Sequence, residues 1–259
     1  MAEPSEFYVG WQEHAPPRLG AFLRVLISAL LFTVTLAGLG FTASHAQYAP
    51  SVFEFGQPRA VEGLLTLNPH PELLVERPGV VGLAPGRSRL LLVGAGKHGA
   101  DHQLARLDGH RVRLQGALIY READTMLELV PGSVEDLGLP GVATAAAAAR
   151  FEDLGEWTLI GEIVDSKCFL GVMNPGNLKP HRACATRCIS GGIPPLFLVR
   201  DDQGAARHLL LVGPEGQAIN DRVLDVIAEP LEVTGRLERH HDRLVFKADP
   251  SDFRRLDGT

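Results

Sequence analysis

The longest feature of the hydrophobic pattern is an apolar run near the N-terminus. Residues 19–41 are apolar apart from Arg24, and no Asp, Glu, Lys or Arg then occurs before Glu54. These 23 residues are enough for one helix to cross a bilayer. Arg18 and Arg24 lie toward its N-terminal end, so the positive-inside rule predicts that residues 1–18 are cytoplasmic and that the chain after the helix is exported.

A cleaved signal peptide is the alternative interpretation of this run. Ser44-His45-Ala46 is an acceptable small-x-small cleavage site. The leader before the apolar core would then be unusually long and acidic, with Glu3, Glu6 and Glu13. This acidity favours the interpretation of residues 19–41 as an uncleaved anchor. The bulk of the chain is expected outside the cytoplasm in either case.

The second half of the chain shows apolar runs typical of short strands. They predict strands over residues 157–166, 194–200 and 208–213, a helix over 216–228, and strands over 231–240 and 243–248. Within the predicted helix, Ile219, Val223 and Val226 recur at the spacing of one helix face. The order β-β-β-α-β-β is that of a five-stranded barrel of the OB (oligonucleotide/oligosaccharide-binding) type.

The exported part also matches itself. Residues 90–137 align without gaps with the segment 119 residues later, and both copies contain the string LLLVG. An upstream match between 61–65 and 159–163 has a shift of 98, so the second copy carries 119 minus 98, or 21, additional residues. The first copy predicts the same order, with strands over 60–67, 88–93, 110–119 and 126–130, a poorly defined second strand, and a short helix near 100–107.

These patterns predict a mainly-β protein made of a transmembrane helix and two OB-like five-stranded modules. The modules cover residues 54–137 and 151–256, and residues 138–150, with five consecutive alanines, form the linker between them. The additional residues of the second module are expected to form an inserted helix that carries cysteine and histidine. A fixed-offset match with identities at Gly and Pro is the signature of an internal repeat.

Composition and charge exclude several classes of protein. The 259 residues carry 25 basic and 31 acidic side chains, a net charge of −6, and no segment dense in Lys and Arg. A protein that binds nucleic-acid phosphates is therefore not expected. Aromatic residues make up only 6%, which also opposes the stacking platforms of single-strand binders. Apolar residues at 45% are typical of a folded chain.

All three cysteines lie in the additional residues of the second module. Cys168 follows the first predicted strand, and a predicted helix starting near Pro180 places His181, Cys184 and Cys188 at i, i+3 and i+7. These three side chains share one helix face. Together with Cys168 they form a candidate set of four ligands for a soft or borderline metal ion.

The ion and the redox state of the thiols stay open at this point. A disulfide from Cys168 to Cys184 or Cys188 would leave one odd cysteine and give His181 no role. The spacing C-x12-H-x2-C-x3-C lacks the paired knuckles of a zinc ribbon, and the absence of C-x-x-C-H excludes covalent haem. Iron–sulfur clusters are disfavoured because no twin-arginine signal precedes the apolar run. Copper and zinc remain.

The residues around the site resemble a recurrent motif. The strings GEIVDSKCFLG (161–171) and HRACATRCISGGIPP (181–195) are similar to the motif C-[FY]-L…H-x-x-C-A-x-x-C…G-x-P of uncharacterised bacterial periplasmic OB-like proteins. The resemblance covers about 40 residues of the second module, and Cys168, His181, Cys184 and Cys188 all match. It implies a metal or redox role in the bacterial periplasm. Together with the apolar run over residues 19–41, which lies outside the resemblance, this predicts a single-pass protein of the bacterial inner membrane with the bulk of the chain in the periplasm.

Two further features of the sequence carry weaker signals. Asp165, at the end of the first strand, could orient a ligand from behind it. Gly94-Ala-Gly-Lys-His-Gly99 lacks the G-x4-G-K-[ST] spacing of a phosphate loop. No nucleophile, general base and pocket can be assigned together, so the sequence favours a non-catalytic protein over an enzyme.

The leading hypothesis is a membrane-anchored accessory or subunit protein with a Cys3His metal or redox site. Its expected partners are the membrane and a periplasmic or inner-membrane protein complex of the respiratory or metalloenzyme class. One alternative is a copper- or thiol-delivery factor that works through Cys184 and Cys188. The other is a structural scaffold stapled by a disulfide from Cys168.

Overall fold

The computed structural model describes residues 15–45, 51–77, 86–122, 124–141, 150–201 and 205–256. Three predicted features lie wholly or partly outside these residues. They are residues 1–14 of the predicted cytoplasmic segment 1–18, the predicted cleavage position Ala46, and most of the predicted linker 138–150. The chain divides into two compact units, residues 1–49 and 50–259, and each is described by itself.

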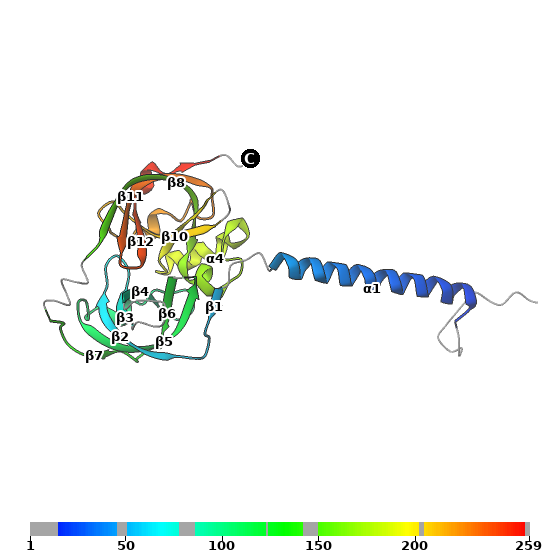
Figure 1. The fold of residues 1–259 in the computed structure, drawn as a ribbon, viewed down its shortest axis with the longest axis horizontal. Helices are drawn as coiled ribbons and strands as arrows, with labels where there is room; N and C mark the ends of the chain where they lie inside the picture. The colour runs from blue at the N-terminus through cyan, green and yellow to red at the C-terminus, as the bar shows by residue number, and fades with distance from the viewer. Residues whose placement is uncertain are drawn as a thin grey trace, which may run out of the picture. The chain divides into compact units, whose positions relative to one another are not determined.

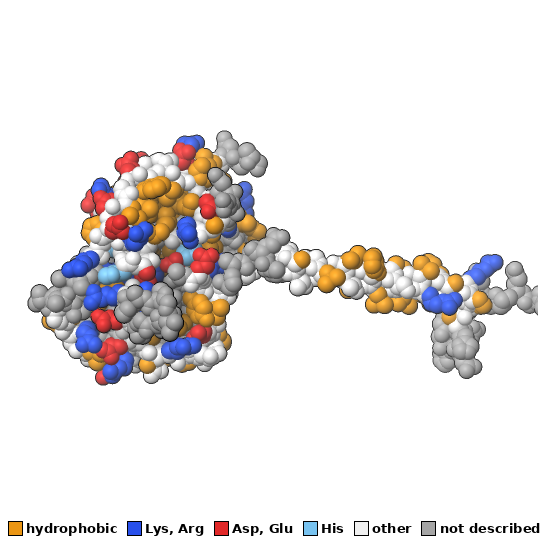
Figure 2. Space-filling model, in the orientation of Figure 1, with side chains coloured by type: hydrophobic (Ala, Val, Ile, Leu, Met, Phe, Trp, Pro, Cys, Tyr) orange, Lys and Arg blue, Asp and Glu red, His pale blue; other side chains and the backbone are white. Residues whose placement is uncertain are grey.

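The first unit contains one long apolar helix, α1 (Pro17–His45). Proline suits the first turn of a helix because its φ is already helical and its missing N–H would have no partner there. The segment Pro17–Ser44 has a mean hydropathy of 2.1, no buried side chain and enough length to cross a membrane. Hydrophobic side chains cover much of its surface in Figure 2. The helix could therefore be a membrane anchor or a signal segment, and its orientation stays a prediction.

The second unit begins with a five-stranded barrel, barrel one. Its strands are β2 (Arg59–Thr66), β3 (Glu72–Arg77), β4 (Gly86–Val93), β5 (Arg111–Arg121) and β6 (Asp124–Leu129), with the one-turn helix α2 (Asp101–Leu104) between β4 and β5. They pair in the closed order β5-β2-β3-β4-β6-β5, in which only β4 and β6 are parallel. Two short strands, β1 (Ser51–Phe53) and β7 (Glu135–Asp136), add to β5.

The chain then forms a second barrel, barrel two, which lies beside barrel one in Figure 1. Its strands are β8 (Glu152–Asp165), β9 (Pro195–Arg200), β10 (Ala206–Val212), β11 (Leu231–His240) and β12 (Arg243–Lys247), and β13 (Arg254–Arg255) adds to β11. The closed order is β8-β9-β10-β12-β11-β8, and only β10 and β12 are parallel. Both barrels therefore have the strand order of an OB-type fold, as predicted.

The internal repeat is present in the strand register itself. In barrel one the parallel pair aligns Leu91 with Met126, and in barrel two it aligns Leu210 with Val245. Both residues of the second pair lie 119 positions after their counterparts, which is the offset of the sequence match. The two copies therefore close their barrels at equivalent residues.

The predicted helix over residues 216–228 is wrong. The structure has only the 3-10 turn η2 (Asn220–Arg222) there. Its apolar residues are buried as expected, but four of them, Ile219, Val223, Val226 and Ile227, are β-branched and favour helix weakly. The amide of Asn220 also donates to the carbonyls of Ile189 and Ile193, at 2.8 and 3.0 Å, and so ties the segment to another part of the fold.

The additional residues of the second copy form two helical pieces between β8 and β9. These are the π-helical turn η1 (Cys168–Val172) and the helix α4 (Leu178–Ser190). The helix ends at Gly191 and Gly192, and Gly192 has a φ of 98°, a conformation that favours glycine. In Figure 1, α4 lies at the side of the two barrels, near the junction between them.

A hydrophobic cluster spans the junction between the two barrels. This cluster contains Cys168 and Cys188 and joins residues of barrel one to residues of barrel two. Its members in barrel one are Leu91, Val93, Ile119 and Met126. Those in barrel two include Val164, Phe169, Leu170, Leu210 and Val245. Each barrel also has a core of its own, around Leu65 and Leu114 in barrel one and around Phe197 and Phe246 in barrel two. Because this cluster is continuous across the junction, the burial of apolar side chains holds the barrels together in addition to polar contacts.

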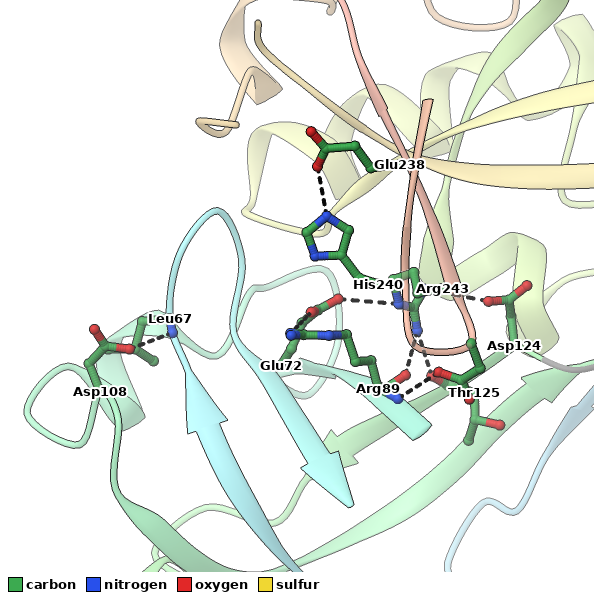
Figure 3. A network of polar contacts seen from close by, with 10 residues as sticks. Leu67, Glu72, Arg89, Asp108, Asp124, Thr125, Glu238, His240 and Arg243 are labelled. Atoms are coloured by element: carbon green, nitrogen blue, oxygen red, sulfur yellow. Dashed lines mark hydrogen bonds and ion pairs between the residues drawn. The ribbon is translucent and has the colours of Figure 1, made fainter. Parts of the chain in front are cut away.

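A buried polar network adds to this junction. The tip of the β11–β12 hairpin reaches barrel one, where Arg243 lies between Glu72 and Asp124 (Figure 3). The guanidinium Nη2 of Arg243 also donates to the carbonyl of Arg89 at 2.7 Å. With Arg243 and Glu72 both buried, the contacts between the two barrels here are desolvated ion pairs.

His70 makes the stability of the unit depend on pH. Its side chain is buried, its Nε2 has no hydrogen-bond partner among the residues that the structure describes, and burial lowers its pKa from 6.5 to about 4. Between these values the unfolded chain binds a proton that the folded chain does not, so stability falls as the pH falls below 6.5. We expect this side chain alone to remove about 2 kcal/mol of unfolding free energy by pH 5.

The measurement is urea unfolding at a series of pH values for the wild type and for His70→Gln. The variant should show a shallower loss of stability between pH 6.5 and 5. Identical slopes for the two proteins would contradict the assignment of the titration to His70.

Candidate metal centre

The helix α4 presents the predicted ligands on one face, as its spacing requires. At its start, the carboxylate of Glu162 on β8 accepts hydrogen bonds from the backbone N–H of Leu178 at 2.9 Å and from the Asn177 amide at 3.3 Å. A carboxylate at this end satisfies a free N–H and complements the helix dipole. The helix is therefore fixed to β8, the strand that leads into Cys168.

The three thiols converge. Cys168 comes from η1, and Cys184 and Cys188 come from consecutive turns of α4. The three Sγ atoms all lie within 4.8 Å of one another, and those of Cys168 and Cys184 are 3.9 Å apart. None of these cysteines is in a disulfide, Cys168 and Cys188 are buried, and Cys184 is partly exposed. The chain thus forms a three-sulfur cluster with one accessible thiol.

His181 and Asp165 lie on the Cys168 side of this cluster. The Nε2 of His181 is 2.8 Å from Oδ2 of Asp165, and Oδ1 of Asp165 accepts a hydrogen bond from the backbone N–H of Cys168 at 2.8 Å. The ligand atoms of Asp165, Cys168 and His181 are within 4.8 Å of one another, which makes a second group that could hold an ion. The two groups share Cys168 alone.

A loop of barrel one reaches the same thiols. Lys97 donates from Nζ to the Sγ of Cys184 at 2.7 Å and to that of Cys188 at 3.5 Å. Its segment, residues 94–99, is the glycine-rich stretch that follows β4. The backbone N–H of Gly99 donates to the carbonyl of Gly191 at 2.9 Å, so the loop is bonded to the end of α4.

Lys167 fixes this loop from the other barrel. The buried Lys167 donates from Nζ to the carbonyls of Gly94 and Gly96, at 2.8 and 2.7 Å, and pairs with Glu128 at 2.5 Å. All three N–H donors of the ammonium are therefore engaged. Lys167, the residue before Cys168, thus holds the loop that carries Lys97. The site is built by both barrels.

The electrostatics of the thiols follow from these contacts. A hydrogen bond between Cys168 and Cys188, burial and the charge of Asp165 raise the pKa of Cys168 well above the ordinary range. The same hydrogen bond, together with Lys97, lowers the pKa of Cys188 to about 7. The hydrogen bond to Cys184 raises the pKa of Lys97, which keeps its ammonium charged. In the free protein Cys188 is thus the thiol of this pair that ionises first.

The structure brings together most of what the sequence singled out. The three cysteines form one group, His181 lies next to Cys168, and Asp165 contacts both His181 and Cys168 from behind. Lys97 was missed. The only signals for it were the glycines around it and the glycine pair at 191–192, which permits the close approach of the loop.

Comparisons with known proteins add little to this description. No protein-family model matches the chain, and no curated protein matches it. Among solved structures, the chain is similar to a deletion mutant of the single-stranded DNA binding protein from Thermus aquaticus, with 14% identity over 81% of this chain and 96% of that chain. The TM-score is 0.22, so this likeness carries no argument about what the chain binds. Any function has to be argued from the geometry of the site.

Proposed function

We propose that the protein is a membrane-anchored, non-catalytic accessory or subunit protein whose Cys/His cluster binds one thiophilic metal ion. Its place is the periplasmic side of the bacterial inner membrane, beside a respiratory or metalloenzyme complex. The observation that carries the proposal is the convergence of three sulfur atoms within 4.8 Å of one another inside the protein.

The residues present fit such an ion. Metal–sulfur bonds are about 2.3 Å long, so sulfurs that share one ion lie roughly 4 Å apart. The distance of 3.9 Å between the sulfurs of Cys168 and Cys184 agrees with this spacing. Thiolates are the soft ligands that copper(I) and zinc accept, and Lys97 supplies a positive charge next to them. When bound, the ion would supply structural closure of the cluster or an electron-transfer centre.

A delivery factor is the second candidate, and one observation favours it. Cys184 is partly exposed whereas Cys168 and Cys188 are buried. An ion that is handed to a client needs one ligand that an incoming thiol can reach. Rapid exchange of the ion with an external chelator would favour delivery, and slow exchange would favour a resident ion.

The first test is metal content. We expect the full-length chain, extracted in detergent and purified without oxygen, to contain about one ion per molecule. Cys168→Ser and Cys184→Ser should each lose it, because two sulfurs bind a soft ion much more weakly than three. Elemental analysis and a count of reactive thiols measure both quantities.

The matched control is Ser166→Ala. Ser166 is buried two positions before Cys168, and its hydroxyl has no partner among the described residues. The variant should keep the ion. A protein without metal, with one free thiol and a disulfide from Cys168, would overturn the proposal in favour of a stapled scaffold.

A further inference from the structure

We propose that the ion is copper(I), held by the three sulfurs alone, with the ammonium of Lys97 as the counter-charge supplied by barrel one. The inference rests on the proposed function and specifies its ion. It also gives barrel one, which has no cysteine, a role in the site: to carry Lys97.

The first step concerns His181, the expected fourth ligand. Its Nε2 is engaged with Asp165 at 2.8 Å. Its ring lies within 4.8 Å of the sulfur of Cys168, but the group that joins Cys168 to Cys184 and Cys188 does not include it. His181 therefore sits behind one corner of the sulfur triangle. Through Asp165, which accepts from the backbone N–H of Cys168, it acts as a positioning residue for that thiol.

The second step concerns Lys97, whose Nζ contacts the sulfurs of Cys184 and Cys188. A protonated amine has no lone pair to give to a metal, and it donates hydrogen bonds to the sulfurs instead. Structural zinc sites are almost always four-coordinate. A site with three sulfurs and an ammonium therefore lacks the fourth protein donor of a closed structural zinc site.

The third step is the charge of the complex. Three thiolates around a monovalent ion carry two excess negative charges, and a buried excess charge is costly unless it is paired. Lys97 offsets part of this charge directly at two of the sulfurs. Copper(I) is a soft ion that accepts a donor set of sulfurs alone, and Lys97 lowers the cost of the excess charge that this complex buries.

Lys97 is held in this position before any ion arrives. The N–H of Gly99 is bonded to Gly191, and Lys167 is bonded to Gly94 and Gly96, so both ends of the loop are fixed. The side chain itself is only half-buried. Its replacement is therefore compatible with folding, and its effect can be measured on the site.

The experiment compares copper(I) and zinc(II) binding to the full-length chain in detergent, without oxygen, in competition with a chromophoric chelator for each ion. Lys97→Met should weaken copper(I) binding by about 10- to 100-fold, the range for residues that contact metal ligands. Lys97→Arg should recover most of it because it keeps the charge. Lys179→Met should leave the affinity unchanged. It removes an exposed lysine from α4, the helix that carries Cys184 and Cys188.

X-ray absorption of the copper-loaded chain gives an independent readout. We expect three sulfur neighbours and no imidazole nitrogen, and the same spectrum for His181→Ala. A tighter affinity for zinc, a nitrogen neighbour that disappears in His181→Ala, or an unchanged copper affinity in Lys97→Met would each overturn the inference while the metal site stands. Binding of neither ion would instead overturn the proposed function.

Discussion

Replacing Gly191 with alanine is expected to separate barrel one from the thiol site. A Cβ atom at this position would lie 1.9 Å from the carbonyl oxygen of Lys97, which is backbone and has no rotamer by which to move away. Relief requires the loop over residues 94–99 to shift, which breaks the bond from Gly99 to Gly191 and withdraws Lys97 from the sulfurs. We expect a loss of about 3 kcal/mol in unfolding free energy, at the upper end of the range for overpacking.

Two measurements together test this expectation. Urea unfolding gives the loss of stability, and the rate of alkylation of Cys184 reports whether Lys97 and its loop have left the site. Gly141→Ala is the matched control, because a Cβ there meets none of the described residues within 4 Å and Gly141 is exposed. If Gly191→Ala left both the stability and the alkylation rate unchanged, the loop would not be held against α4 as described.

Replacing Arg243 with methionine is expected to have the largest effect on stability. The guanidinium is buried and lies 3.2 Å from Glu72 and 3.6 Å from Asp124, and it donates to the carbonyl of Arg89 (Figure 3). Methionine keeps much of the side-chain volume but leaves two carboxylates without this partner at the junction. Removing one member of a buried charge network typically costs about 3–5 kcal/mol.

The control is Arg239→Met on β11, the other strand of the same hairpin. Arg239 pairs with Glu152 at 2.8 Å, but both side chains are about half exposed or more, and exposed pairs contribute less than about 1 kcal/mol. Chemical unfolding of both variants gives the comparison. Equal, small losses would mean that apolar contacts alone hold the barrels together and that water solvates the carboxylates once Arg243 is gone.

The fold could be predicted from the sequence because its strands are short, apolar and bounded by turns. The LLLVG strings mark the third strand of each copy, and the constant offset of 119 residues extends to the strand register. The predicted helix over residues 216–228 failed because periodicity cannot distinguish a helix from an irregular segment that buries the same side chains. There the local contacts of Asn220 and the β-branched residues decided the outcome.

The candidate site could be predicted only as far as local geometry extends. One helix carries His181, Cys184 and Cys188, so their common face follows from helical spacing. Lys97 is 87 positions before Cys184 and belongs to the other barrel. Its contact depends on how the two barrels dock, and no local pattern carries that information.

The hydrophobic cluster across the junction also has a consequence for the order in which the protein is made. Barrel one is complete in the chain by residue 141, whereas the residues that cover Leu91, Val93, Ile119 and Met126 extend as far as Val245. At a synthesis rate of roughly 5–20 residues per second, the remaining residues take on the order of ten seconds to appear. During that interval barrel one presents an apolar face with no cover. A nascent chain with such a face exposed is prone to aggregation until its second copy arrives.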